Sequence, residues 1–103
     1  MVIYVDIDET ICAYPGEREY PKAQPIMENI KIINDLYELG NEVIYWTARG
    51  SVTGIDWTEL TVQQLNGWGA KYTKVRLGKP HYDLFICDKA ITSIDFFKRF
   101  EDE

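Results

Sequence analysis

Cysteine and long apolar runs are scarce in this chain of 103 residues, and each scarcity excludes a class of protein. The two cysteines, Cys12 and Cys87, are too few for a disulfide framework, and neither belongs to a Cys-x-x-Cys zinc motif. We therefore expect free thiols in a reducing compartment. No stretch approaches the roughly 18 successive apolar residues of a membrane span, and no basic segment precedes an apolar one as in an export signal. The sequence predicts a soluble, cytoplasmic protein that does not bind membranes.

An excess of positive charge is also absent. The formal net charge is −6 and the sequence pI is about 4.7. Proteins that bind nucleic-acid backbones usually gather Lys and Arg on one face, so this balance argues against a nucleic-acid partner. A small anionic ligand needs only a locally positive pocket, and it stays compatible with the acidic chain.

What the chain does contain is an alternation of apolar runs and amphipathic segments. The length sets a single domain, residues 1–103, without room for a second. Apolar or alternating patterns predict strands at 2–5, 43–46, 71–77 and 84–87. Helical spacing or capping residues predict helices at 25–39, 56–65 and 93–100. This order predicts parallel βαβ units in a three-layer α/β sandwich with a Rossmann-like sheet.

Three carboxylates and a hydroxyl follow the first predicted strand, in the stretch MVIYVDIDET. Asp6 stands at the carboxyl end of that strand, the edge where open α/β sheets bind ligands. Asp8 is two residues further in extended chain and can lean toward the same site. Two carboxylates so close need a cation or a shared proton, and we expect a divalent metal together with a proton-carrying carboxyl.

Polar residues also end the later predicted strands. Thr47, Ala48 and Arg49 follow the second strand, Lys79 lies in the loop after the third, and Asp88 ends the fourth. Because the carboxyl ends of parallel strands meet at one edge of a sheet, we expect these residues to converge on Asp6 and Asp8. For Arg49, a substrate contact and a surface partner for an acidic residue are both open.

These motifs resemble those of the haloacid dehalogenase-like (HAD) superfamily. The family has Asp-x-Asp-x-Thr after its first strand, Thr or Ser after its second, a downstream Lys and a final acidic residue. Here they stand as DIDET, WTARG, LGKP and ICDKA, and the resemblance spans residues 2–92. The stretches IYWTARG and GKPHYDLFICDKA are more particularly similar to small capless HAD phosphatases of capsule and lipopolysaccharide sugar biosynthesis.

The resemblance implies a phosphatase that forms a phosphoaspartate. Asp6 would be the nucleophile, and Asp8 would be the acid and base, with a pKa raised by its neighbour. Thr47 and Lys79 would bind the phosphoryl group. Asp6, the backbone carbonyl of Asp8 and Asp88 would hold Mg²⁺, whereas Thr10, Ala48 and Arg49 would serve the substrate side. The implied function is Mg²⁺-dependent hydrolysis of a small phosphomonoester, such as a sugar phosphate.

Two positions depart from the family pattern. Glu9 replaces the usual Gly, which puts the backbone geometry of that turn in question. The final motif has Cys87 before Asp88, where many relatives have two acidic residues, so we expect a water-mediated contact to be missing and metal affinity to be weaker.

Other functions stay open at this point. A nucleic-acid end phosphatase shares such a core, and a non-catalytic receiver-like module also places Asp, Thr and Lys at strand ends. The polar segment 11–25, a loop with a small hairpin at its base, is positioned to cover the site. Without a cap domain, we expect a homo-oligomer of two or more chains.

Overall fold

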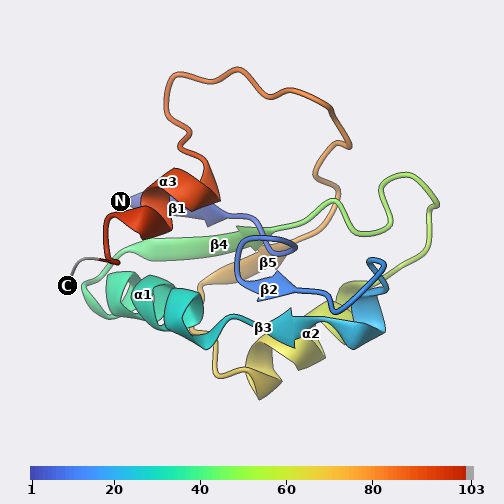
Figure 1. Ribbon diagram of the computed structural model, residues 1–103, viewed down its shortest axis with the longest axis horizontal. Helices are drawn as coiled ribbons and strands as arrows, with labels where there is room; N and C mark the ends of the chain where they lie inside the picture. The colour runs from blue at the N-terminus through green and yellow to red at the C-terminus, as the bar shows by residue number, and fades with distance from the viewer. Residues whose placement is uncertain (102–103) are drawn as a thin grey trace.

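The computed structural model describes residues 1–101 and shows an α/β arrangement built on a parallel sheet. The sheet has the order β1-β4-β5, formed by β1 (Val2–Val5), β4 (Glu42–Trp46) and β5 (Lys74–Arg76). Val2 pairs with Glu42 and Val5 with Tyr45, so β1 and β4 run in step and end at the same edge. The predicted parallel α/β architecture is therefore confirmed (Figure 1).

One face of the sheet is closed by helices α1 (Met27–Glu38) and α2 (Thr58–Gly67) (Figure 1). The fully buried side chains of Val43 and Tyr45 alternate along β4 and pack with Ile33 of α1 and Leu65 of α2. Apolar residues at alternate positions of β4 and along one side of each helix thus form one core.

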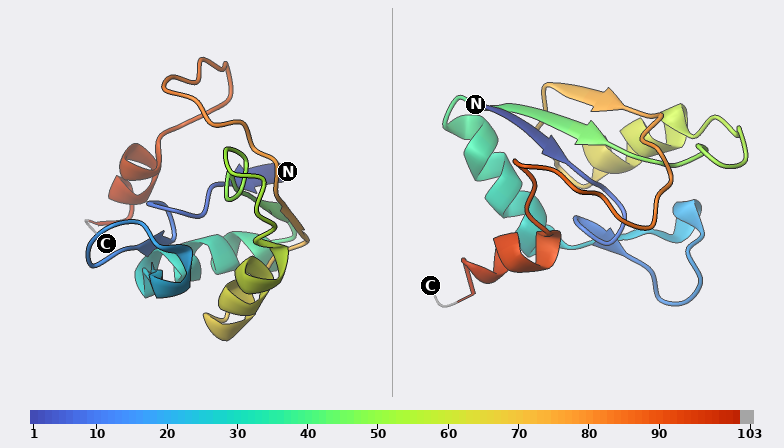
Figure 2. Two further views of the ribbon diagram at one scale, coloured as in Figure 1. Left: turned by 90° about the vertical axis from the view of Figure 1, so that its right-hand side faces the viewer. Right: turned by 90° about the horizontal axis from the view of Figure 1, so that it is seen from above.

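The opposite face is more open. Val2 and Tyr4 of β1 are 59% and 50% exposed, although the Tyr4 ring packs edge-on against Trp46. Helix α3 (Ser93–Lys98) lies beyond β1 at the margin of the sheet (Figure 2), and Thr92 caps it by accepting a hydrogen bond from the Asp95 N–H. Within residues 1–101, the third layer of the predicted sandwich is therefore not confirmed.

The fourth predicted strand is absent, which corrects the prediction for 84–87. Residues 77–92 form an irregular segment that arches away from the sheet (Figure 1), and Leu84 and Ile86 are 74% and 88% exposed. Apolar residues make a strand only when their backbone groups find a neighbouring strand, and this segment has none in the described chain.

Segment 11–25 contains the small hairpin that the sequence predicted. Strands β2 (Cys12–Ala13) and β3 (Gln24–Pro25) pair antiparallel, and the short 3₁₀ helix η1 (Tyr20–Lys22) lies between them. Pairing of Pro25 with Cys12 delays the start of α1 to Met27, two residues after the predicted start. Within residues 1–101, no helix combines the length and apolar character needed to span a bilayer.

Candidate functional site

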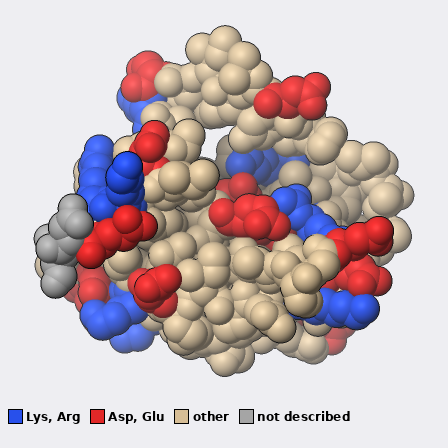
Figure 3. All heavy atoms as spheres, in the orientation of Figure 1, with Lys and Arg blue, Asp and Glu red and all other residues tan. Residues whose placement is uncertain are grey.

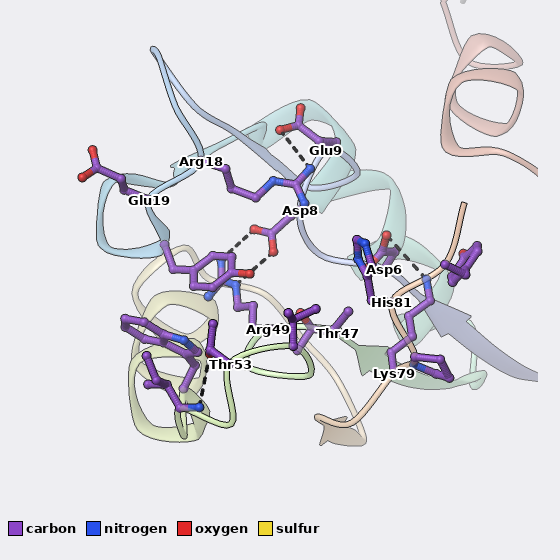
Figure 4. Close-up of a pocket in the computed structure, with 18 of the residues that line it drawn as sticks. Asp6, Asp8, Glu9, Arg18, Glu19, Thr47, Arg49, Thr53, Lys79 and His81 are labelled. Carbon is purple, nitrogen blue, oxygen red and sulfur yellow. Dashed lines mark hydrogen bonds and ion pairs between the residues drawn. The ribbon is translucent and has the colours of Figure 1, made fainter. Parts of the chain in front are cut away.

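A cavity of about 810 Å³ opens at the carboxyl edge of the sheet (Figure 4). Its lining includes Asp6 and Asp8 after β1, Thr47 to Arg49 after β4, and Lys79 after β5. The parallel register explains this meeting, because each strand delivers its following residues to the same edge. The structure thus brings together the predicted residues of three strand ends.

Asp6 and Lys79 form the first half of the site. The Lys79 ammonium lies 3.6 Å from an Asp6 carboxylate oxygen, and the other Asp6 oxygen accepts the Ile7 N–H at 2.9 Å. Partial burial raises the pKa of Asp6 above its ordinary value, although the positive charge of Lys79 opposes that rise. The Asp6 side chain is still 42% exposed, so its carboxylate is accessible from the cavity.

Lys79 is held in place by its backbone and by aromatic rings. Its N–H donates to the Thr47 carbonyl at 3.1 Å, which ties the third strand-end loop to the second. Its ammonium lies 5.7 Å from the centre of the Trp46 ring and 5.4 Å from that of Tyr82. The Lys79 side chain is only 14% exposed and lines the cavity, so its positive charge acts mainly inside the cavity.

Asp8 and Arg49 form the second half, and here the predicted pKa was wrong. Arg49 Nε donates to Asp8 Oδ2 at 3.1 Å and Nη2 donates to Oδ1 at 2.9 Å, while the Tyr14 hydroxyl also donates to Oδ1. Burial alone raises the pKa of Asp8, but these donors outweigh burial and hold the pKa below its ordinary value. Figure 4 shows the Asp6 and Asp8 carboxylates turned toward different cations.

Arg49 is a buried residue, with 2% exposure. Its Nη1 donates to Thr61 Oγ1 at 3.1 Å and to Gln64 Oε1 at 2.6 Å, both on α2. The guanidinium carbon lies 4.9 Å from the centre of the Tyr20 ring. Of the two roles left open by the sequence, pairing with an acidic residue is the one observed, but inside the protein rather than at its surface.

Thr47 and Ala48 also line the cavity. The Thr47 hydroxyl accepts the Arg49 N–H at 3.1 Å, and Thr47 is 1% exposed. Thr10 lies outside the lining: its N–H donates to the Ile7 carbonyl at 3.1 Å, and its carbonyl accepts from Asn29 at 3.0 Å. Thr10 therefore braces the turn that carries Asp8.

Asp88 is not brought to the cavity, because the strand that was predicted to carry it is not formed. It lies exposed on the arching segment, where its carboxylate accepts a long contact from Cys87 Sγ, at 3.8 Å. No group of three His, Cys, Asp or Glu side chains with metal-binding geometry occurs among residues 1–101. The predicted set of Asp6, Asp8 and Asp88 is thus incomplete in this arrangement.

Sequence reasoning missed the partners of Asp8 and Arg49, namely Tyr14, Tyr20, Thr61 and Gln64. Tyr14 and Tyr20 could have been flagged as aromatic residues in a polar loop directly after the acidic cluster. Thr61 and Gln64 carry no such signal, because a polar residue on a helix is ordinarily read as solvent-exposed.

Glu9 adopts a left-handed conformation, with φ of 63°. The turn therefore has the backbone geometry expected for a glycine, which adopts it with little strain because it has no Cβ. The Glu9 carboxylate lies 3.5 Å from the Arg18 guanidinium at the rim of the cavity. On the face shown in Figure 3, acidic and basic side chains are interspersed and form no broad basic surface.

Comparisons with known proteins identify a fold and no family. No protein-family model matches the sequence, and no curated protein is found as a relative. A solved structure described as a crystal structure of an MCSG target from Vibrio cholerae is similar, with a TM-score of 0.81 and 24% sequence identity. The match covers 92% of this chain and 85% of the other. At this identity the likeness supports the α/β fold alone.

Proposed function

We propose that this protein is a phosphomonoester hydrolase that works through a phosphoaspartate on a small phosphorylated metabolite, such as a sugar phosphate. The observation that carries the proposal is the meeting of Asp6, Asp8, Thr47 and Lys79 around one cavity, with Lys79 3.6 Å from Asp6. Phosphoryl transfer requires mainly a positioned nucleophile and neutralised charge, and these residues can supply both. The cavity, about 810 Å³, also has room for a leaving group larger than phosphate.

In the first step, an Asp6 carboxylate oxygen attacks phosphorus and the ester P–O bond breaks. Lys79 offsets the negative charge of the phosphoryl oxygens. The leaving oxygen takes a proton from Asp8. Because Arg49 keeps Asp8 ionised before substrate arrives, that proton enters with the substrate: a phosphomonoester monoanion, whose second pKa is about 6, hands its proton to Asp8.

In the second step, water attacks the phosphorus of the aspartyl phosphate. The bond between phosphorus and the Asp6 oxygen breaks, inorganic phosphate forms, and Asp8 takes the proton that the water loses. Asp6 is thereby released as a carboxylate, and Asp8 returns to its ionised state when it passes the proton to the departing phosphate, which leaves as the monoanion. Asp8 in its resting, ionised form is already prepared for this second role.

Mg²⁺ is the cofactor that the donor set suits. Asp6 retains an accessible carboxylate, and Mg²⁺ prefers carboxylate, carbonyl and water oxygens. Asp6, the carbonyl of Asp8 and Asp88 would hold the ion, which would supply further neutralisation of phosphoryl charge. Asp88 can take part only after its segment approaches the sheet.

We further propose that residues 84–87 dock as a strand on the free edge of β1. Leu84, Phe85 and Ile86 are 74%, 51% and 88% exposed, and among residues 1–101 β1 pairs with β4 while its other edge has no strand partner. A parallel strand there would carry Asp88 to the edge where β1 ends, and it would extend the sheet toward the predicted three-layer sandwich. Amide hydrogen exchange at 84–87 with and without Mg²⁺ tests this: protection gained with Mg²⁺ supports docking, and unchanged rapid exchange argues against it.

The function itself is tested by phosphate release from a panel of phosphorylated metabolites, with Mg²⁺ and with EDTA. We expect metal-dependent release that Asp6→Asn abolishes and that Asp35→Asn, an exposed carboxylate on α1, leaves unchanged. A 3′-phosphorylated oligonucleotide in the panel tests the nucleic-acid alternative. Stable aspartyl phosphate from acetyl phosphate, without turnover, would instead identify a receiver-like module and overturn the proposal.

A further inference from the structure

Arg49 uses its donor groups on protein partners. Nε and Nη2 grip the two oxygens of Asp8 at 3.1 and 2.9 Å, Nη1 bonds Thr61 and Gln64 of α2, and Nη2 lies 3.3 Å from the Tyr14 hydroxyl. The Arg49 side chain has no exposed surface and that of Asp8 has 9%. An arginine so engaged is poorly placed to bind a substrate phosphate directly.

The paired contacts fix the orientation of the Asp8 carboxylate. A planar guanidinium that bonds both oxygens of a carboxylate restrains its distance and its rotation, which a single ammonium group does not. The Tyr14 hydroxyl, at the start of the loop that follows β2, also donates to Oδ1. The Asp8 oxygens are therefore held at one place relative to Asp6.

The same guanidinium also holds one wall of the cavity. Its face lies over the Tyr20 ring at 4.9 Å, and Gln64, which accepts from Arg49, donates its Nε2 to the Tyr20 carbonyl at 2.6 Å. The Tyr20 ring packs edge-on against Trp57, with ring centres 5.3 Å apart, and both residues line the cavity. Arg49 thus joins the Asp8 turn, α2 and the loop around η1 (Figure 4).

We propose that Arg49, assisted by Tyr14, is a positioning residue that aims the Asp8 carboxyl at the leaving-group oxygen. This inference deepens the proposed function and rests on it. A misaimed Asp8 slows P–O cleavage most for esters whose leaving oxygen is strongly basic, since such an oxygen needs a proton as the bond breaks. An ester with a weakly basic leaving group departs without that help.

The test compares phosphoenzyme formation from an alkyl phosphate and from p-nitrophenyl phosphate in wild type and in Arg49→Lys, which keeps the charge and loses the fork. We expect cleavage of the alkyl ester to slow by about 10²-fold, the lower range for acid–base catalysis. Cleavage of the nitrophenyl ester changes less than about threefold by comparison, so the ratio of the two rates moves by more than tenfold.

Tyr14→Phe provides a second variant in case Arg49→Lys does not fold. It removes one donor to Asp8 while retaining the ring and the Arg49 fork, so we expect the same change in rate ratio at smaller size. Gln64→Leu is the matched structural control, because it removes an Arg49 contact without touching Asp8. It is expected to alter both esters by the same factor.

Equal losses on the two esters in Arg49→Lys and in Tyr14→Phe would overturn the positioning role while leaving the phosphatase intact. Unchanged rates on both esters would overturn it as well. If wild type cleaves neither ester with Mg²⁺ present, the proposed function fails and the positioning role fails with it. Failure of the positioning role is thus distinguishable from failure of the proposed function, because only the last result concerns wild-type protein.

Discussion

The Lys79 ammonium lies 3.6 Å from the Asp6 carboxylate, on a backbone that is itself bonded to Thr47. The Lys79 charge therefore acts directly on Asp6 and lies next to the carboxylate oxygen proposed to attack phosphorus. The Lys79 charge can act in two ways: it can offset negative charge on the phosphoryl group, and it can stabilise the ionised form of Asp6. Substitutions separate these two effects.

Replacing Lys79 by Met is expected to lower kcat/KM for a phosphomonoester by about 10²–10³-fold, the range seen when one group that stabilises transition-state charge is removed. Methionine keeps an unbranched apolar stem and removes the ammonium group that lies over the Trp46 and Tyr82 rings. The measurement is steady-state phosphate release under saturating Mg²⁺. Lys31→Met, an exposed helix position, serves as the control. Wild-type activity in Lys79→Met would remove Lys79 from the proposed mechanism.

Asn substitutions at Asp6 and Asp8 are expected to change stability in opposite directions when measured without metal. The folded-state pKa of Asp8 is lowered, so its ionised form contributes stability above pH 3.8 that is lost as pH falls through the folded value. Asp8→Asn leaves the buried Arg49 charge without its partner and should cost about 3 kcal/mol near neutral pH. The deficit should shrink below pH 3.8.

Ionisation of Asp6 has the opposite effect on the stability of the fold. Its folded-state pKa is raised, so ionisation destabilises the fold as pH rises from 3.8 through the folded value. Asp6→Asn removes that cost, and urea unfolding in EDTA should show a variant more stable than wild type at neutral pH, with the difference disappearing in acid. A destabilised Asp6→Asn would show that the Lys79 contact outweighs desolvation. Stability equal to wild type at every pH in Asp8→Asn would contradict the buried ion pair.

Much of the fold follows from local patterns in the sequence. The apolar runs at 2–5 and 43–46 lie in strands β1 and β4, and the helical spacing from Ile26 onward lies in helix α1, because their apolar faces share one core. The run at 84–87 has an equally apolar composition and forms no strand. An apolar composition makes a segment able to pair as a strand. Pairing also needs the free edge of a second strand, and that strand lies in another part of the chain.

The candidate site, like the fold, could be predicted from the sequence only in part. Asp6, Thr47 and Lys79 could be placed together from sequence because each follows a strand, and parallel strands share an edge. The ionisation of Asp8 could not be predicted, since it depends on Arg49, which lies 41 positions away in the chain and is oriented by Thr61 and Gln64. Contacts of this kind arise only after the helices pack.

Replacing Glu9 by Gly is expected to stabilise the fold by about 1 kcal/mol, because Glu9 has a φ of 63° and a left-handed residue with a Cβ carries a strain of that order. The ion pair with Arg18 is on the surface and contributes little. Glu9→Ala is the control: it loses the same pair but keeps the Cβ, so its stability should stay close to that of wild type. If Glu9→Ala and Glu9→Gly unfold at the same urea concentration, backbone strain at this turn is refuted.

Replacing Gly50 by Ala is expected to disrupt the loop that carries one side of the cavity. Gly50 has a φ of +82°, and a Cβ at this position would collide with the Ile55 carbonyl oxygen and approach Trp57 Cδ1 to 3.3 Å. Backbone has to move to relieve that collision, so we expect a loss of about 3 kcal/mol and a several-fold rise in KM, as Ile55 and Trp57 line the cavity.

Gly54→Ala separates the collision from backbone strain alone. Gly54 has a similar φ of +78°, yet a Cβ there meets no atom within 4 Å. This variant should lose only about 1 kcal/mol, the cost of a left-handed alanine, and should keep the wild-type KM. Chemical unfolding and steady-state kinetics on both variants give the comparison. Equal losses of stability in the two would mean that contact between Gly50 and Ile55 does not hold the loop, and an unchanged KM in Gly50→Ala would mean that this side of the cavity does not meet the substrate.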